Sequence, residues 1–453
     1  MNNRLNWCAG VAVAFAAIAI LVAALVPVSD VAEIHCADSP ANFSLANPQL
    51  TQDDSPSSGG KENRIAAASD EFPTRWPADD HEGWRIPIPG KSDAAPCLWG
   101  DYVFLFSADP GSRRVSILCN NRSDGHLAWR TQLHVSAAHE TAVGDFRVFV
   151  TPVCDGRNVY AVTSFDGQLW VTAVNFDGKI VWQHAAGPHD FIAQYRSSPI
   201  LFKSLVIVAA DRAAGSYLAA LHRQTGEIIW RIKRPDGESF GTPAIATIAG
   251  RAQLVLGGRK SVHSYDPATG ECIWLCRTQA ERCSNSVAFD TEHVYASGPG
   301  PNTGLVCIKA DGRGDITASH LVWQIPGITG EFPSPVYHDK SLYVLADDGR
   351  LSCVRTDAGK VEWTRQLDGH FVASPVIAGK FLLCANRSGK VCFVQTGIPG
   401  LPAIENMLAG HIDVAPVIAG DSIYIRTSRY LHRIDSSLPE HVAERTEPDR
   451  RRF

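Results

Sequence analysis

The chain has 453 residues and a formal net charge of −5, with 45% hydrophobic and 20% charged residues. This composition can supply a large core, and the acidic balance excludes a protein that binds nucleic acid through an overall positive charge. Methionine is scarce, with 2 residues, whereas 37 glycines, 27 prolines and 11 tryptophans favour strands and turns over long helices.

An uncharged apolar segment lies close to the N-terminus. Arg4 lies in a short segment, residues 1–7, and no charged side chain occurs in residues 8–28. About 20 apolar residues span a bilayer, and a basic residue before such a span keeps the N-terminus in the cytoplasm. We favour an uncleaved transmembrane signal-anchor; a cleavable signal peptide is the alternative. Both interpretations place the bulk of the chain outside the cytoplasm, in the periplasm or at the cell surface.

Two further segments have the composition of unfolded chain. Residues 29–82 contain 11 acidic and 3 basic side chains and few apolar ones. Such a segment cannot bury enough surface to offset the entropy that ordering removes. We therefore predict a disordered acidic tether over 29–82. Residues 436–453 balance four acidic residues with four arginines, and we predict a disordered tail there.

The remaining region, residues 83–435, is built from a repeat. Each copy has a small residue and a proline, two short apolar strands, a turn that ends in glycine, and a tryptophan. The small residues and their neighbours are Ala95-Pro96, Thr151-Pro152, Ser198-Pro199, Thr242-Pro243, Ser286-Val287, Ser334-Pro335, Ser374-Pro375 and Ala415-Pro416. The tryptophans are Trp84, Trp129, Trp182, Trp230, Trp274, Trp323 and Trp363. Seven steps over 320 residues give about 46 residues per copy, which is typical of propeller blades.

The repeat predicts an all-β, eight-bladed propeller of four-stranded antiparallel sheets. The last copy, residues 422–435, has no tryptophan strand, whereas an extra strand with Trp84 precedes the first copy at residues 83–90. We predict that this N-terminal strand completes the last blade and closes the ring. The tryptophans are expected to dock one blade on the next, because an indole ring buries a large apolar face. The seventh copy lacks tryptophan, which predicts an irregular outer strand.

These hairpins resemble a known family. Phrases such as TGEIIW at residues 225–230, each followed by a small residue and proline, are similar to the pyrroloquinoline-quinone-like (PQQ-like) repeat. The resemblance covers residues 83–435 and points to the quinoprotein alcohol dehydrogenase-like superfamily. It implies an eight-bladed propeller. The superfamily includes quinone-dependent dehydrogenases and non-catalytic envelope proteins, such as the propeller lipoprotein of the outer-membrane β-barrel assembly machinery.

The enzymes of this superfamily have features that the sequence lacks. They carry two adjacent cysteines against the quinone, together with calcium ligands and a catalytic aspartate. This sequence has no Cys-Cys pair and no C-x-x-C-H haem motif, and no calcium ligand or catalytic aspartate can be placed by motif. We therefore disfavour PQQ with calcium, predict no catalytic, cofactor-binding or metal-binding residues, and lean against an enzyme.

Cysteines recur at one position of the repeat, before the turn glycine, where other copies carry alanine or serine. Small size is the shared property, which predicts buried packing residues. These cysteines are Cys119, Cys307, Cys353 and Cys392.

Polar side chains precede the inner strands of the second and third copies. His139 and Glu140 come before the second inner strand, and His189 and Tyr195 come before the third. Because the starts of inner strands converge on the centre of a propeller, we predict that these four are channel-rim residues that could contact a ligand. Solvated loop residues without a ligand are the simpler alternative.

Together these features predict a membrane-anchored extracytoplasmic propeller that acts as a non-catalytic binding or scaffold module in the cell envelope. Its expected partner is an unidentified envelope protein or ligand, with contact to the membrane through the N-terminal helix and none to nucleic acid. A PQQ-dependent oxidoreductase is the first alternative, and an extracytoplasmic ligand-sensing domain is the second.

Overall fold

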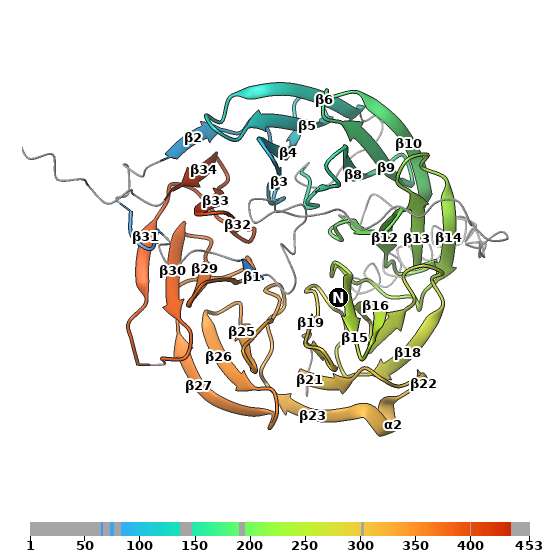
Figure 1. Ribbon diagram of the computed structural model, residues 1–453, viewed down its shortest axis with the longest axis vertical. Coiled ribbons are helices and arrows are strands. Elements are labelled where there is room, and N and C mark those ends of the chain that lie inside the picture. Colours follow the sequence, from blue (N-terminus) through green and yellow to red (C-terminus); the bar gives the residue numbers. More distant parts are fainter. Residues whose placement is uncertain are drawn as a thin grey trace, which may run out of the picture.

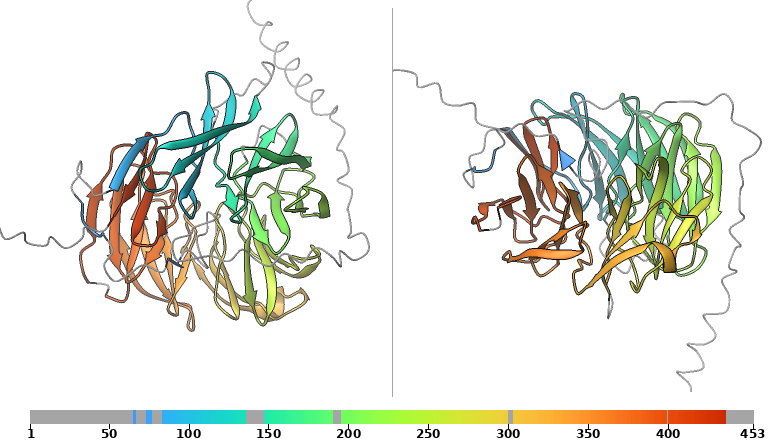
Figure 2. Two further views of the ribbon diagram at one scale, coloured as in Figure 1. Left: turned by 45° about the horizontal axis from the view of Figure 1, so that its top comes forward. Right: turned by 60° about the horizontal axis from the view of Figure 1, so that its bottom comes forward.

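The strands are arranged as eight blades around a common centre (Figure 1). The computed structural model describes residues 65–66, 73–76, 83–135, 147–189, 195–299, 303–398 and 400–435. Each blade is a sheet of four antiparallel strands, ordered from the centre of the ring outward. Two blades gain a short fifth strand. Figure 2 shows the same ring in two tilted views. The predicted eight-bladed all-β propeller is therefore confirmed.

The first four blades follow one another along the chain. Blade 1 comprises β3 (Cys97–Trp99), β4 (Tyr102–Asp109), β5 (Arg114–Asn121) and β6 (Leu127–Val135). Blade 2 comprises β7 (Val153–Cys154), β8 (Asn158–Phe165), β9 (Gln168–Asn175) and β10 (Ile180–Pro188). Blade 3 comprises β11 (Ile200–Phe202), β12 (Leu205–Ala210), β13 (Tyr217–His222) and β14 (Ile228–Lys233). Blade 4 comprises β15 (Ala244–Ile248), β16 (Arg251–Gly258), β17 (Ser261–Tyr265), β18 (Cys272–Arg277) and the added β22 (Gly314–Asp315).

The last four blades include the two described strands that precede blade 1 in the chain, β1 and β2. Blade 5 comprises β19 (Ala288–Phe289), β20 (His293–Ala296), β21 (Gly304–Lys309) and β23 (Leu321–Pro326), with the short helix α2 (Thr317–His320) before β23. Blade 6 comprises β24 (Val336–His338), β25 (Ser341–Leu345), β26 (Arg350–Arg355) and β27 (Lys360–Gln366). Blade 7 comprises β28 (Val376–Ala378), β29 (Phe381–Ala385), β30 (Lys390–Gln395), β31 (Ile404–Met407) and the added β1 (Ile65–Ala66). Blade 8 comprises β32 (Val417–Ala419), β33 (Ser422–Arg426), β34 (Tyr430–Ile434) and β2 (Gly83–Pro87).

The ring closes through the N-terminal strand β2. It pairs antiparallel with β34, with Trp84 opposite Arg433, and so forms the outer strand of blade 8. This confirms the predicted closure. One sheet thus holds both ends of the propeller, and no blade is left as a free end of the array.

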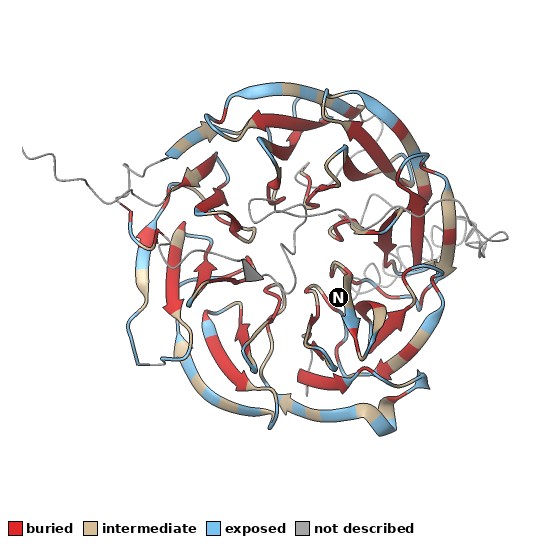
Figure 3. Cartoon of the chain, viewed as in Figure 1, coloured by how far each residue is buried: buried red, intermediate tan, exposed pale blue. Residues whose placement is uncertain are grey.

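Burial follows the position of a strand within its blade. All six residues of β12 are buried, whereas exposed and half-buried residues alternate along β27 at the outer edge. Figure 3 shows this pattern around the whole ring. Strands inside a blade have neighbouring blades on both faces and need continuous apolar sequence, while an outer strand faces solvent on one side.

The tryptophans of the outer strands lie against glycines of the next blade. The ring of Trp182 covers Gly226, where a Cβ atom would lie only 2.6 Å from the indole, and its N–H donates to the carbonyl of Arg223 at 2.9 Å. Glycine is therefore required at this turn both by the close approach and by its φ of +77°. The other pairs of this kind are Trp84 on Gly125, Trp129 on Gly178, Trp230 on Gly270 and Trp323 on Gly359.

The two remaining tryptophans have different contacts. Trp274 is fully buried, and its N–H donates to Oε1 of Gln253 at 2.7 Å. Trp363 is half-buried, with its ring 6.1 Å from that of Tyr343. Both still lie in cores between blades.

Blade 7 receives its tryptophan from outside the blade. Register places Ile404 opposite Phe393, the position that Trp363 holds opposite Cys353 in blade 6. Trp76 packs on Phe393 with the ring centroids 5.6 Å apart, and it lies in the core between blades 7 and 8. An indole from before the propeller therefore fills the place that the repeat leaves without one.

Two polar contacts hold this segment. The backbone N–H of Trp76 donates to Oδ1 of Asn406 at 3.1 Å, and Nδ2 of Asn406 donates to the carbonyl of Thr74 at 3.0 Å. Earlier in the chain, β1 pairs in parallel with β28, the innermost strand of the four-stranded repeat unit of blade 7. Residues 65–66 and 73–76 of the predicted tether thus pack on the propeller, and its other residues up to 82, with the tail from 436, lie outside the described residues.

The cysteine position of the repeat needs one correction. Cys119, Cys307 and Cys353 are buried and lie opposite a tryptophan of the neighbouring strand. Cys392 is also buried, but Phe393 holds the equivalent position in blade 7 and Cys392 faces blade 6. The predicted burial of Cys392 is confirmed, but its predicted repeat position was wrong, because that position was counted from the turn glycine and the connection from β30 to β31 differs in length.

The predicted membrane segment cannot be compared with the structure. Within the described ranges, no helix has the length and apolar character needed to cross a bilayer. Residues 1–7 and the predicted anchor, 8–28, lie outside those ranges.

Replacing Trp182 with alanine should lower the free energy of unfolding by roughly 3–5 kcal/mol, because the change removes a buried indole and leaves a cavity. Urea denaturation of the purified chain measures the loss. A loss below about 1 kcal/mol would contradict the docking role.

Two glycine variants provide a matched control for this contact. Gly226 and Gly167 have φ values of +77° and +69°, but a Cβ at Gly167 meets nothing within 4 Å. Gly167→Ala should lose about 1 kcal/mol from backbone strain alone, and Gly226→Ala should lose clearly more, because its Cβ collides with Trp182. If urea denaturation shows that both variants lose the same unfolding free energy, the packing of the Trp182 indole does not require glycine at position 226.

Replacing Trp76 with alanine should lower the free energy of unfolding by about 3 kcal/mol, because the indole is 9% exposed and fills the core between blades 7 and 8. Arg75→Ala is the control, since Arg75 is exposed beside it and its loss should stay within about 0.5 kcal/mol. Similar small losses for both variants would mean that the segment before the propeller does not stabilise blade 7.

Candidate functional site at the channel mouth

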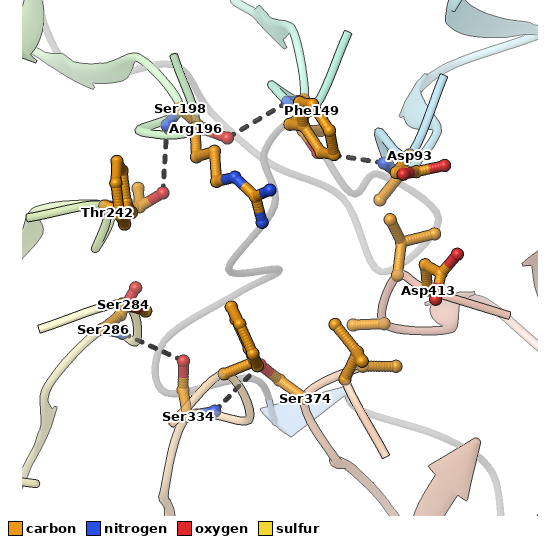
Figure 4. Close-up of a pocket in the computed structure, with 18 of the residues that line it drawn as sticks. Asp93, Phe149, Arg196, Ser198, Thr242, Ser284, Ser286, Ser334, Ser374 and Asp413 are labelled. Atoms are coloured by element: carbon orange, nitrogen blue, oxygen red, sulfur yellow. Dashed lines mark hydrogen bonds between the residues drawn. The ribbon is translucent and has the colours of Figure 1, made fainter. Parts of the chain in front are cut away.

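The small residues before the inner strands meet at one end of the channel. They line a cavity of about 380 Å³, to which all eight blades contribute (Figure 4). The contributing residues are Ala95, Thr151, Ser198, Thr242, Ser286, Ser334, Ser374 and Ala415. We call this cavity the channel mouth.

Hydroxyl groups connect these residues from blade to blade. The N–H of Ala95 donates to Oγ1 of Thr151 at 3.1 Å, and the N–H of Thr151 donates to Oγ of Ser198 at 3.1 Å. The same bond joins Ser198 to Thr242, Ser286 to Ser334 and Ser334 to Ser374, each at 3.0 Å. The motif of a small hydroxyl residue before proline is thereby explained: the side chain must be short enough for inner strands to approach and must accept a neighbour's N–H.

The seam between blades 8 and 1 uses a different group. Ala95 has no hydroxyl to accept the N–H of Ala415, and the contact across this seam comes from Arg426 of β33, which donates to carbonyls of blade 1. Its Nη1 donates to the carbonyl of Ala94 at 3.2 Å and its Nη2 to the carbonyl of Phe106 at 3.1 Å. Burial lowers the pKa of Arg426 to about 10, so this guanidinium remains charged at neutral pH.

A second ring of side chains lies two residues before the first. Residues two apart in an extended chain point the same way, so every blade sends one further side chain into the mouth. This ring consists of Asp93, Phe149, Arg196, Phe240, Ser284, Phe332, Val372 and Asp413.

Charge is arranged unevenly across this ring. Arg147 Nη1 lies 2.7 Å from Oδ2 of Asp93, and Arg387 Nε lies 2.5 Å from Oδ1 of Asp413. Figure 4 shows both carboxylates on one side of the mouth and Arg196 reaching toward its centre from another side. The mouth therefore has two distinct charged regions.

Arg196 lies between two phenyl rings. The central carbon of its guanidinium is 4.2 Å from the ring centroid of Phe149 and 5.8 Å from that of Phe240. Burial lowers the pKa of Arg196, with further lowering from nearby arginines. Such stacking holds a guanidinium plane in a defined direction, so the group is suited to recognising a planar anion.

The carboxylates of the mouth do not form a calcium site. Calcium takes six to eight oxygen ligands, usually several of them carboxylates. Asp93 and Asp413 each form an ion pair with an arginine. Over the part of the chain that the structure describes, no three His, Cys, Asp or Glu side chains are grouped as metal ligands.

Two of the four predicted channel-rim residues, His189 and Tyr195, are described by the structure, and neither lines the channel mouth. His189 and Tyr195 are 3% and 8% exposed, with rings 5.2 Å apart, and Oγ of Ser164 lies 2.8 Å from Nδ1 of His189. Tyr195 packs in the core of blades 2 and 3, and the next residue, Arg196, lines the mouth instead. His139 and Glu140 lie outside the described residues. Counting two residues back from each small residue before proline would have found the second ring.

Fold and repeat now define the class of protein. An eight-bladed propeller of glycine–tryptophan hairpins is a PQQ-like propeller of the quinoprotein superfamily. The model of the PQQ_2 family, described as Outer membrane protein assembly factor BamB, matches residues 63–239, 214–315 and 258–398. The chain belongs to this family.

Individual relatives agree with this assignment. The outer membrane protein assembly factor BamB of Yersinia pestis is 22% identical over 302 residues, which cover 64% of this chain and 68% of the relative. The crystal structure of BamB from Moraxella catarrhalis has a TM-score of 0.57 at 14% identity and covers 78% of this chain and 98% of that one. Quinohemoprotein alcohol dehydrogenase from Comamonas testosteroni has a TM-score of 0.61 at 12% identity, over 84% of this chain and 80% of that one. At such identities the structural likeness shows the fold alone.

Thr151→Val should lower the free energy of unfolding by about 1–3 kcal/mol, because valine has the same shape and leaves the buried N–H of Ala95 without its acceptor. Thr151→Ser keeps the hydroxyl and should lose less. Urea denaturation of the two variants decides the point. A valine variant as stable as the serine variant would mean that the hydroxyl ring does not stabilise the mouth.

Proposed function

We propose that this protein is a membrane-anchored, extracytoplasmic propeller that binds another protein of the cell envelope and catalyses no reaction. The observation that carries the proposal is the chemistry of the channel mouth. Its second ring offers a stacked guanidinium, phenyl rings and arginine-paired carboxylates, which are groups of recognition. Membership of a family described as an outer membrane protein assembly factor supports the same conclusion.

The uneven charge of the mouth suggests how a partner is oriented. Arg196 would pair with a carboxylate of the partner while Phe149 and Phe240 contact the apolar side chains next to it. Asp93 and Asp413 lie on another side, where each is already paired with an arginine of the protein. An extended segment with an acidic residue next to apolar ones would therefore bind with its carboxylate at Arg196.

Rigid support is what makes the mouth suitable for this role. Five of the small residues before the inner strands donate their N–H to a hydroxyl of the next blade, as Thr151 does to Ser198. Loops held by a rigid scaffold bind with little loss of conformational entropy. The contacts of Trp76 and β1 would also tie blade 7 to the part of the chain that leads to the predicted anchor at 8–28.

Charge reversal at the mouth should abolish capture of the partner. Full-length tagged protein, expressed in its own host and cross-linked in the envelope, would be compared as wild type, Arg196→Glu and Lys179→Glu. Lys179 is exposed in the turn between β9 and β10, at the other end of the blade, and its variant changes the charge equally. Arg196→Glu should reduce the amount of captured partner at least about tenfold, because a glutamate would repel the carboxylate that Arg196 is proposed to bind. Lys179→Glu should not reduce it.

Two results would overturn the proposal. Equal capture by both variants would place the interface away from the mouth, provided that thermal unfolding shows both variants folded. Stoichiometric binding of PQQ with calcium, together with oxidation of an alcohol or sugar, would favour the oxidoreductase alternative.

A further inference from the structure

We propose that Cys97 and Cys154 form a disulfide that joins blade 1 to blade 2 beside the channel mouth. Their sulfur atoms lie 3.3 Å apart across the seam between the two blades. Both side chains are completely buried, and 57 residues separate them in the sequence. The inference goes beyond partner binding and concerns a covalent modification of the fold.

The repeat itself brings the two sulfurs together. Cys97 follows Ala95-Pro96 in β3, and Cys154 follows Thr151-Pro152 at the end of β7. The N–H of Ala95 donates to Oγ1 of Thr151 at 3.1 Å, just before both cysteines, so the two inner strands are held at a fixed spacing there. Bonded sulfurs lie about 2.05 Å apart, so an approach of about 1.2 Å is enough.

The neighbouring cysteine has a different role. Cys119 belongs to the same buried cluster, but it lies opposite Trp129 as the small residue of the repeat. The geometry therefore singles out Cys97 and Cys154 within this seam.

A second pair of cysteines must be distinguished experimentally. Cys384 and Cys392 are register partners on β29 and β30, two neighbouring strands of blade 7. A bond between them would join one sheet to itself, whereas Cys97 and Cys154 would join two blades. Peptide mapping separates the two possibilities.

The oxidation is a thiol–disulfide exchange. The thiolate of one cysteine attacks an oxidant disulfide and releases one of its thiols; the second cysteine then attacks the mixed disulfide and releases the other. The two cysteines lose two protons and two electrons, and the oxidant disulfide becomes two thiols. Since both sulfurs are buried in the folded chain, the exchange must precede closure of the seam. Such oxidants act outside the cytoplasm, so the inference rests on the extracytoplasmic location proposed above.

The bond would act on the mouth. Cross-linking constrains the unfolded chain between residues 97 and 154. It would also fix the two inner strands that follow Asp93 and Phe149, two members of the second ring. The disulfide would thereby fix the positions of Asp93 and Phe149, which lie next to each other in the mouth.

The first experiment maps the bond directly. Full-length protein is extracted from its host with thiols alkylated at once, and a second sample is unfolded, reduced and refolded in reduced and oxidised glutathione. Mass spectrometry of unreduced peptides should find Cys97 linked to Cys154 in both samples. Alkylation of both cysteines in both samples, or a link of either to another cysteine, would overturn the proposal. A bond in the refolded sample alone would support the geometry and overturn the extracytoplasmic location.

The second experiment measures the effect of the bond. The wild-type chain, unfolded in urea and refolded with reductant present throughout, should have a Tm at least about 3 °C below that of the chain refolded with oxidised glutathione, and the same treatment should not change the Tm of Cys97→Ala or Cys154→Ala. Cys272→Ala is the control, because Cys272 is exposed in β18, and it should respond as the wild type does. A wild-type Tm that is insensitive to reductant would overturn the proposed joint.

Discussion

The packing of an indole ring on a glycine of the next blade is the contact on which the rest of the structure depends. Each sheet has two apolar faces and cannot bury them alone, so the blades must cover one another around a closed ring. The ring of Trp182 reaches Gly226 only because that glycine has no Cβ and adopts a positive φ. Its N–H bond to Arg223 adds direction to the contact. Repeated around the ring, this joint sets the spacing of the blades and, through it, the width of the centre.

The seams that lack a standard group show the same constraint. Blade 7 has Ile404 in place of tryptophan, and Trp76, from before the propeller, fills the core there. Between blades 8 and 1 the hydroxyl is missing, and Arg426 bonds two carbonyls of blade 1 instead. In both places a group from outside the usual pattern makes a contact across the seam, because an unfilled core or an unpaired buried carbonyl would lower the stability of the whole ring.

A rigid ring explains how the mouth can serve recognition. Every blade contributes a residue to the rim, and hydroxyl bonds join five of the seams between blades, so the stacked Arg196 and the paired Asp93 and Asp413 are held in defined relative places. The fold is shared with quinoprotein dehydrogenases, but a fold does not determine a function. In this mouth the carboxylates that could serve as cation ligands are paired with arginines.

The sequence by itself determined the class of fold, the number of blades and the closure by the strand with Trp84, because each depends on a local pattern repeated at a regular spacing. Tertiary structure alone decided that Trp76 supplies blade 7 and that Cys97 meets Cys154. Arg196 lies two residues before Ser198, a position that the repeat marks, but only the structure shows that this position and not Tyr195 faces the mouth. The contacts of Trp76 and of Cys97 join residues that are distant in the chain, because they form where separate blades are brought face to face.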